Sequence, residues 1–348
     1  MKMTVQNEPD ATLRQRHQAL QAAEPGLRIR DRARRLGVSE AELVAAGCGV
    51  EAVALALPPQ PLVQALGTLG RVMALTRNDG CVHERHGRYE DIRAEGHMGL
   101  VLGPDIDLRL FFDHWASAYA VVEQGRYSLQ FFDHSGTAVH KVYRTEATDA
   151  QAWATLVARH ASAHPPPLQL QPPVAPDAAT EADDPAALRA DWLALQDTHE
   201  FFPMLKRFKL TRLAALRAVG PDLAQPVPTD TAERVLQAAA TSALRIMCFV
   251  ANRGVVQIHS GPVQRLLRTG PWFNVLDPDF NLHLNTEAIA ARWVVNKPTR
   301  DGWVTSLEVY DRAGSLMLQC FGERKPGHRE LPAWRDLMAG LCPHRLAS

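Results

Sequence analysis

The chain has 348 residues, enough for two domains or one large one, which excludes a disulfide-stabilised miniprotein or a peptide hormone. Lys plus Arg and Asp plus Glu both number 38, and the resulting formal net charge of zero argues against a broad basic surface for nucleic acid or an anionic membrane. The hydrophobic fraction of 46% and the charged fraction of 22% are typical of a soluble globular protein.

The N-terminal residues lack the apolar core of a secretion signal, and no run of the chain approaches the roughly 18 apolar residues that a membrane-spanning helix needs. The five cysteines are odd in number and widely spaced, and they include no C-x-x-C pair. This spacing predicts free thiols rather than a disulfide framework or a zinc ribbon. We therefore expect a cytoplasmic protein.

Two parts of the chain resemble each other across a proline-rich stretch. Three blocks of the first part match three blocks of the second part in the same order, with identities such as Asn78 with Asn252 and Gly80 with Gly254. The matched blocks are residues 71–87 with 245–261, residues 99–110 with 273–284, and residues 128–143 with 306–321. The pattern predicts one structural unit that occurs twice.

The boundaries of the two units follow from the composition between them. We expect an N-terminal repeat over residues 1–162 and a C-terminal repeat over residues 191–348. Residues 163–190 combine clustered prolines with small and acidic residues and have no apolar periodicity. That composition is typical of a semi-rigid, solvated linker.

The matched blocks carry the alternating apolar positions and the β-branched and aromatic residues of strands. Turn signals separate the strands at residues 78–80, 133–136 and 311–314. Because strands joined by short turns run in opposite directions, we expect antiparallel meanders.

Helical patterns precede and follow these strands. Ser39 and Glu42 form a capping box that predicts a helix ending at Gly47, and a similar helix is expected between Thr211 and Gly220. A last helix is expected in residues 331–341. The predicted fold class is α+β, with two tandem duplicated halves that each form an antiparallel β-sheet with flanking helices.

Common enzyme motifs are absent from the sequence: it has no G-x-G-x-x-G after a strand, no P-loop, no G-x-S-x-G elbow and no H-E-x-x-H. Dinucleotide enzymes, nucleotide hydrolases and α/β-hydrolases are therefore disfavoured. The fourteen histidines have to be judged by position. For His83 and His86 a structural polar role is favoured over ligation, and His134 and His140 are expected to be exposed in a hairpin.

His199 is the histidine with the most specific setting. Trp192, Leu195, His199 and Phe202 follow helical spacing, which predicts the imidazole on the apolar stripe of an amphipathic helix. Spacing alone favours a buried core histidine. The alternative is an axial ligand of a haem iron, because a neutral imidazole shielded from water suits that role once its other ring nitrogen has a partner.

Basic residues follow His199 closely. They form either a solvated basic face or a set of cations that would bind the propionates of a haem ligand. These residues are Lys206, Arg207, Lys209 and Arg212.

Arg109 is unusual because it lies within an apolar strand, between Leu108 and Leu110. A buried guanidinium is costly unless acceptors surround it. As a strand residue it faces opposite to its two leucine neighbours, so it is either exposed at the surface or directed into a pocket, where it could polarise a bound water or dioxygen.

Long stretches of the chain resemble the haemin-degrading factor family, the cytoplasmic haem-utilisation proteins of Gram-negative bacteria. The stretches are RVMALTRNDGCVHERHGRYEDI, GLVLGPDIDLRLFFDHW, THEFF, NRGVVQIHSGPV, GPWFNVLDPDFNLHL, KPTRDGWVTSLEVYD and QCFGERKPG. The resemblance extends from about residue 25 to residue 340. It implies two repeated α+β halves, in agreement with the duplication.

The resemblance also implies site residues. The proximal haem ligand would be His199, and Arg109 would lie on the distal side, where it would serve a catalytic role if the haem is degraded. Residues implied around the propionates and the pocket are Arg212, Lys297, Arg324, Gln319 and Phe321; relatives often have tyrosine at the position of Phe321, which leaves a hydroxyl contact there in doubt. A second haem contact in some relatives corresponds to His83.

Two functions follow from the resemblance. The first is a haem-binding protein for haem uptake and iron utilisation that holds one non-covalent haem through one histidine and passes it on, with a haem oxygenase or a haem importer as partner. The second is an enzyme that opens its bound haem with reductant and dioxygen. A nucleic-acid partner is disfavoured by the zero net charge, although basic stretches such as RIRDRARR remain.

Overall fold

A computed structural model describes residues 12–165, 167–174, 181–325 and 327–348. Helices and strands of the N-terminal half are α1 (Leu13–Ala23), α2 (Ile29–Leu36), α3 (Glu40–Ala46), β1 (Ala52–Ala54), α4 (Gln60–Ala65), η1 (Leu66–Thr68), β2 (Gly70–Arg77), β3 (Cys81–Gly87), β4 (Ile92–Glu95), β5 (Met98–Leu102), β6 (Asp107–Phe111), η2 (Phe112–His114), β7 (Ser117–Glu123), β8 (Arg126–Phe132), β9 (Ala138–Thr148) and α5 (Ala150–His160).

The C-terminal half repeats this order. Its elements are α6 (Pro185–Leu193), η3 (Thr198–Glu200), α7 (Phe201–Phe208), α8 (Arg212–Ala218), β10 (Ala224–Pro226), α9 (Thr231–Ser242), β11 (Ile246–Ala251), β12 (Val255–Gly261), β13 (Leu266–Thr269), β14 (Trp272–Leu276), β15 (Phe280–Asn285), η4 (Thr286–Ala288), β16 (Ile289–Thr299), β17 (Gly302–Asp311), β18 (Leu316–Gly322) and α10 (Pro332–Leu341). The predicted α+β class, the antiparallel meanders and the capped helices after Ser39 and Thr211 are confirmed.

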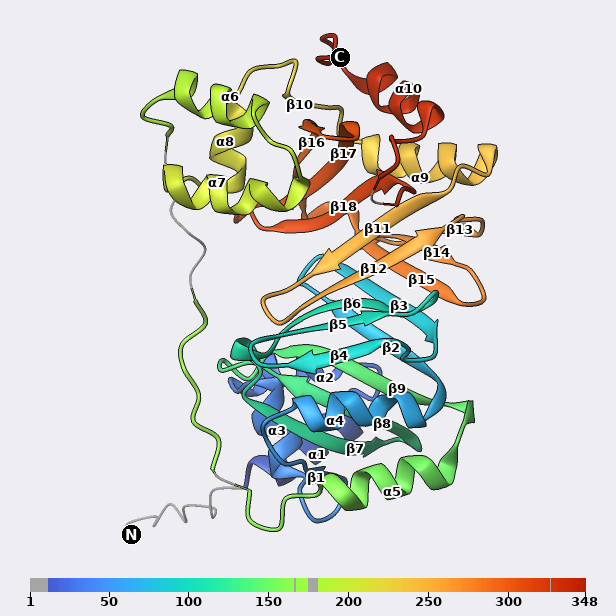
Figure 1. Ribbon diagram of the computed structural model, residues 1–348. Coiled ribbons are helices and arrows are strands. Elements are labelled where there is room, and N and C mark those ends of the chain that lie inside the picture. The colour runs from blue at the N-terminus through green and yellow to red at the C-terminus, as the bar shows by residue number, and fades with distance from the viewer. Residues whose placement is uncertain (1–11, 166, 175–180, 326) are drawn as a thin grey trace.

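The strands form two nine-stranded antiparallel sheets that exchange strands between the halves (Figure 1). The N-terminal sheet has the order β1-β7-β8-β9-β2-β3-β15-β14-β13, and the C-terminal sheet has the order β10-β16-β17-β18-β11-β12-β6-β5-β4. Each half therefore contributes one three-stranded meander to the sheet of the other half, through the pairs β12–β6 and β3–β15. The two repeats of the sequence are interlocked in space.

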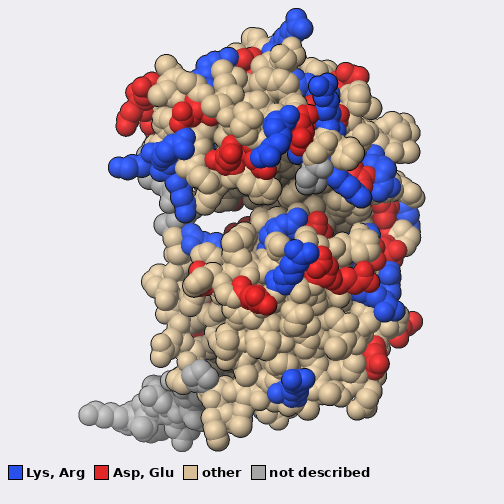
Figure 2. Space-filling view, viewed as in Figure 1, with Lys and Arg blue, Asp and Glu red and all other residues tan. Residues whose placement is uncertain are grey.

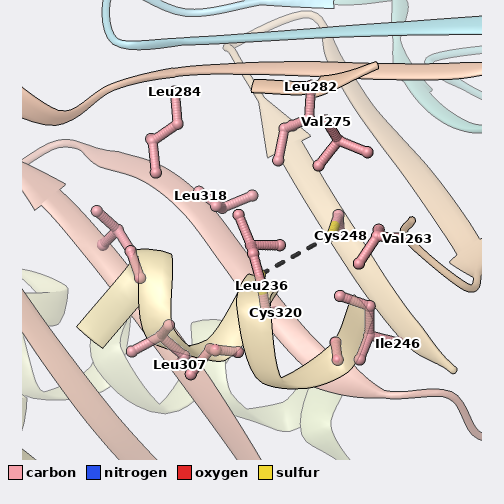
Figure 3. Close-up of a cluster of buried hydrophobic side chains, with 14 of the residues drawn as sticks. Leu236, Ile246, Cys248, Val263, Val275, Leu282, Leu284, Leu307, Leu318 and Cys320 are labelled. Atoms are coloured by element: carbon pink, nitrogen blue, oxygen red, sulfur yellow. Dashed lines mark hydrogen bonds between the residues drawn. The ribbon is translucent and has the colours of Figure 1, made fainter. Parts of the chain in front are cut away.

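One face of each sheet, which we call the inner face, lies in the core. On the C-terminal sheet it carries Cys248 and Cys320, and it packs against α9, α10 and the exchanged strands β14 and β15 (Figure 3). The equivalent core of the N-terminal sheet packs against α4, α5 and the exchanged strands β5 and β6. Each exchanged meander thus belongs to the sheet of the other half, while its buried side chains pack in the core of its own half.

The other face of each sheet, the outer face, is covered by three helices at one end only. Helices α6–α8 pack on β16 and β17 of the C-terminal sheet, where they bury Trp192, Phe201 and Tyr310. Helix α3 packs in the same way on β7 of the N-terminal sheet. Helix α6 begins at Pro185, within the range expected for the linker, because the Asp184 side chain caps it and Leu188 is buried.

Two equivalent asparagines join the halves at the centre of the molecule. The side-chain amide of Asn78 donates to the carbonyl oxygens of Ala251 at 3.1 Å and Met317 at 2.8 Å. The amide of Asn252 donates in the same way to Arg77 at 3.0 Å and Val139 at 2.8 Å. Both side chains also accept backbone N–H groups of their own turns. The duplicated turns therefore hold each other reciprocally.

Replacing Asn78 or Asn252 by Ala should lower the free energy of unfolding by about 1–3 kcal/mol each, because each change leaves carbonyl groups at the interface without donors. Urea unfolding followed by circular dichroism measures the effect. Asp79→Ala in the same turn is the control, because the Asp79 side chain is 95% exposed and should cost less than half as much. Equal effects of the control and the asparagine variants would contradict this role.

Three histidines are buried at the inner faces, and one of them corrects an expectation. His140 is not exposed in its hairpin: Nδ1 lies 2.9 Å from the Thr76 hydroxyl and Nε2 lies 2.6 Å from the Tyr89 hydroxyl. Burial lowers the pKa of His140 to about 3, and burial with nearby Arg85 lowers the pKa of His259 to about 3. Burial also lowers the pKa of His83.

These shifts predict acid sensitivity. A histidine in the unfolded chain binds a proton near pH 6.5, whereas these side chains stay neutral in the folded protein, so their contribution to stability is present above pH 6.5 and is lost as the pH falls toward 3. Between pH 7 and pH 5 we expect a loss of about 1–2 kcal/mol for each of His140 and His259. The urea midpoint at pH 7, 6 and 5 measures it, and His140→Gln should flatten the slope. A midpoint that does not change with pH would refute the assignment.

Candidate functional site

Helices α6–α8 cover the outer face of the C-terminal sheet only at β16 and β17. The rest of this face, on β18, β11, β12 and β6, carries partly exposed side chains. Strand register places Phe249 opposite Gln319 on one side and opposite Ile258 on the other, and Ile258 lies opposite Asp107. Since side chains alternate along strands, one face carries side chains from both halves of the chain. We call this surface the open face; its residues are Asp107, Arg109, Met247, Phe249, Val256, Gln319 and Phe321.

The open face is largely apolar but carries one cation. The rings of Phe249 and Phe321 meet edge to face with centroids 5.1 Å apart. Arg109 is 32% exposed, forms an ion pair with Asp107 and donates to the carbonyl of Leu108 at 3.2 Å. Leu108 and Leu110 are buried on the inner face. The opposite orientation expected for Arg109 is therefore confirmed, and strand exchange brings it to the C-terminal sheet.

The helix expected to carry His199 is interrupted, which corrects the placement of that residue. Helix α6 ends at Leu193, and Asp197 then caps a short 3-10 helix by accepting the backbone N–H of His199 at 2.8 Å. The cap ends the regular spacing, so His199 and Phe202 leave the apolar stripe: the His199 side chain is 92% exposed, and Phe202 is also exposed. His199 is a surface residue rather than a core histidine.

Asp197 determines the chemistry of the His199 ring. Its carboxylate lies 2.6 Å from Nδ1, so Nδ1 donates, and in the neutral ring the lone pair is then on Nε2. The backbone N–H of His199 and the imidazole together lower the pKa of Asp197, which keeps it ionised. This is the partner expected for a metal-binding histidine, since such residues usually bind a carboxylate or carbonyl through the second nitrogen. Nε2 of His199 is suited to bind an iron.

A buried ion cluster lies beneath the helices at the edge of the open face. The Glu308 carboxylate is fully buried, and it accepts from the Arg212 guanidinium at 2.6 Å and 2.5 Å and from the Lys297 ammonium at 3.3 Å. Gln319 donates to it at 2.8 Å, Ser306 donates at 3.1 Å, and the Tyr310 hydroxyl also donates. We call Glu308, Arg212, Lys297 and their hydrogen-bond partners the Glu308 cluster.

The charges of this cluster stabilise one another. Burial alone would raise the pKa of Glu308, but Arg212 and Lys297 hold it far below its ordinary value. Burial lowers the pKa of Lys297 to about 8, against the opposing effect of Glu308. The cluster contains two cations and one carboxylate, so it keeps one positive charge beside the open face.

Phe201 connects the cluster to His199. Its buried ring is 4.3 Å from the Lys297 Nζ atom and 4.8 Å from the Arg212 Cζ atom, within the range of cation–π contacts. It also meets the Trp192 ring edge to face at 4.7 Å. Phe201 is the first residue of α7 and directly follows η3, which contains His199. These contacts therefore anchor the chain next to His199.

The remaining residues implied by the resemblance lie in two places. Gln319 and Phe321 belong to the open face, and Arg324 follows β18 beyond Phe321. Arg324 is half-buried, and its buried Nη1 atom makes no hydrogen bond to the described residues, which leaves one of its donors unsatisfied. His83 does not join them: it is fully buried on the inner face of the N-terminal sheet, beside Phe280.

Sequence reasoning did not single out Glu308. A signal was present, because Glu308 stands between Leu307 and Val309 in a strand of buried residues, as Arg109 stands between leucines. What could not be read was its partner, since Arg212 lies 96 positions away.

The N-terminal half contains an equivalent cluster with reversed polarity. Its helix starts with Glu40 after the Ser39 cap, where the C-terminal helix starts with Arg212 after Thr211. Glu40 is buried and pairs with Arg77 and Lys141 of the N-terminal sheet. Here the carboxylate is on the helix and the cations are on the sheet.

The donors and shape of the open face fit haem. A flat, apolar sheet surface suits a porphyrin, an exposed imidazole Nε2 suits its iron, and the cations of Arg324 and the Glu308 cluster suit its carboxylates. Lys and Arg side chains gather around a hollow between the upper and lower parts of the molecule (Figure 2). In the described part of the chain no group of three His, Cys, Asp or Glu could hold a metal ion.

A cavity of about 950 Å³ lies elsewhere, between linker residues 171–174, α2 and the turns of Asn78 and Asn252. Its lining residues do not include those of the open face. Among the described residues, none of the helices has the length and apolar composition needed to cross a membrane.

Comparison with known proteins places the chain in a protein family. The model of the haemin-degrading HemS.ChuX domain matches residues 37–160 and 209–341. The hemin transport protein HmuS of Yersinia pestis is 42% identical over 344 residues, covering 97% of this chain and all of that protein (100%). Holo-PhuS, a heme-binding protein from Pseudomonas aeruginosa, has 47% identity and a TM-score of 0.92, covering 96% of this chain and 99% of that chain. ChuS, an E. coli heme oxygenase, has 37% identity and a TM-score of 0.88, covering 96% of this chain and 100% of that chain.

Proposed function

The chain belongs to the family of haemin-degrading HemS.ChuX domain proteins, and we propose that it binds one non-covalent haem on the open face for haem uptake in the cytoplasm. The axial ligand is Nε2 of His199. The observation that carries this assignment is the pairing of His199 Nδ1 with Asp197 on a side chain that is 92% exposed, which directs the contact with Asp197 to Nδ1 and leaves Nε2 outside it. A second support is the apolar surface of Phe249 and Phe321, on which a porphyrin ring can lie.

In this proposal the propionates bind the cations at the edge of the open face. Arg324 has a buried nitrogen without a hydrogen bond among the described residues, and the Glu308 cluster has an excess positive charge. Charge-assisted hydrogen bonds from arginine and lysine to carboxylates are stronger than neutral ones. Gln319 and Phe321 contact the haem on the open face, and Phe321 contributes its ring but no hydroxyl.

The hand-off of haem is part of the same proposal. One axial bond from an exposed imidazole leaves the ligand accessible, which suits a protein that gives haem to a haem oxygenase or receives it from an importer. The descriptions of HmuS as a hemin transport protein and of PhuS as a heme-binding protein agree with this role.

A second candidate function is haem degradation, favoured by Arg109. Its side chain is about one third exposed on the open face, where it could hold a distal water or dioxygen by hydrogen bonding. The similar protein ChuS is described as a heme oxygenase. Bound haem would supply the redox chemistry, and the chain would orient it and hold the distal ligand.

The axial ligand is tested by His199→Ala. Loss of the imidazole should weaken haem binding at least tenfold, or about 1.4 kcal/mol, and shift the Soret band, since the axial bond disappears. Spectroscopic titration with haemin measures both. His97→Ala is the matched control, because His97 is likewise exposed and its Nδ1 lies 2.6 Å from an aspartate. Unchanged affinity and spectrum in the His199 variant would refute the assignment.

The two functions are separated by incubating the haem complex with ascorbate, with and without catalase. If the protein is a haem carrier, loss of the haem band should stop when catalase is present, because free peroxide causes it. Haem transfer to a separate oxygenase should then be faster than passive release. An open-chain tetrapyrrole formed in the presence of catalase, and reduced by Arg109→Ala, would instead establish degradation.

A further inference from the structure

The Glu308 cluster already contains the contacts that a haem propionate would make. Arg212 directs its Nε and Nη2 atoms at the two carboxylate oxygens of Glu308, and Lys297 directs its ammonium at one of them. Glu308 is fully buried, and Lys297 is 5% exposed. Without haem, an internal carboxylate therefore occupies the hydrogen-bonding groups proposed for the ligand.

We propose that Glu308 is a positioning residue that also competes with the haem propionates for Arg212 and Lys297. This inference rests on the proposed function and concerns what limits affinity at the same site. The carboxylate keeps both cations in place beside Phe201, and its negative charge reduces their attraction for a second carboxylate. The competition sets how readily the protein releases haem.

The number of charges in the cluster favours competition between Glu308 and the propionates over a purely structural role of Glu308. Two cations share one carboxylate, so one positive charge remains for the ligand. A propionate that approaches Arg212 also approaches the Glu308 charge, and like charges repel strongly where water is excluded. A carrier that needed only tight binding would be better served by a neutral residue at position 308.

The other half of the chain shows that the fold itself does not require a carboxylate on this strand. Gln130 occupies the position equivalent to Glu308 in the duplicated strand, and it is also buried. There the buried carboxylate is Glu40, which comes from the helix. The acidic residue on the strand is thus particular to the half that carries His199.

The test is Glu308→Gln in the full chain, which keeps the shape of the side chain and removes its charge. The dissociation constant of haemin and the rate of haem transfer to apomyoglobin are compared with those of haemin dimethyl ester, which has no propionate charge. We expect haemin binding to tighten and transfer to slow at least fivefold. The constants for the ester should stay within twofold, because the ester gains nothing from the freed cations.

Glu40→Gln is the matched control, because it removes a buried carboxylate that also pairs with one arginine and one lysine. It should lower the melting temperature as Glu308→Gln does but leave haemin affinity unchanged. If Glu308→Gln does not fold, Glu308→Asp takes its place: the shorter side chain keeps the charge balance and withdraws from Arg212. A smaller tightening of haemin binding, about twofold, is then expected, with the constants for the ester unchanged.

Weaker haemin binding in Glu308→Gln, or equal changes for haemin and its ester, would overturn the inference, because the carboxylate would then act only as support. A matching change in Glu40→Gln would overturn it as well. The proposed function is judged separately. Loss of binding in His199→Ala with no effect of Glu308→Gln refutes only the competition, whereas a wild-type chain that does not bind haemin refutes both.

Discussion

The antiparallel pairing of β6 with β12 is the constraint on which the site depends. Its register places Arg109 opposite Val256 and Asp107 opposite Ile258, and so brings residues of the first half to the sheet that carries Glu308 and Gln319. The equivalent pair, β3 with β15, does the same for the other sheet. Backbone hydrogen bonds thus join the halves into one folding unit, and the reciprocal contacts of Asn78 and Asn252 hold the crossing point.

Duplication with strand exchange produced two outer faces with the same geometry and different chemistry. Beside the helices of the C-terminal sheet, His199 presents an exposed imidazole with the Asp197 carboxylate on Nδ1. Its buried ion cluster has the carboxylate on the strand and the arginine on the helix, the reverse of the arrangement around Glu40. In both halves an ion cluster joins the first helical residue after the cap to the sheet, with the signs of the charges exchanged.

Rigid and exposed parts are combined at the candidate site. Phe201 is held by Trp192 and by the cations of Arg212 and Lys297, all deeply packed around a charged network. Two residues earlier, His199 projects into solvent, and its ring contacts the Asp197 carboxylate. A fixed base with an accessible ligand atom suits reversible binding, because the imidazole needs no large rearrangement to meet or release an iron.

Local patterns in the sequence determined the α+β class, the duplicated unit, the capped helices at Ser39 and Thr211 and the outward orientation of Arg109, because alternation, turns and caps depend on near neighbours. The resemblance named the site residues, but tertiary structure decided their settings. An aspartate cap moved His199 off the apolar stripe, burial placed His140 and His83 in the core, and Glu308 gained partners distant in the chain. The strand exchange could not be predicted from local sequence patterns, because either meander could have paired within its own half with the same alternation of apolar and polar residues.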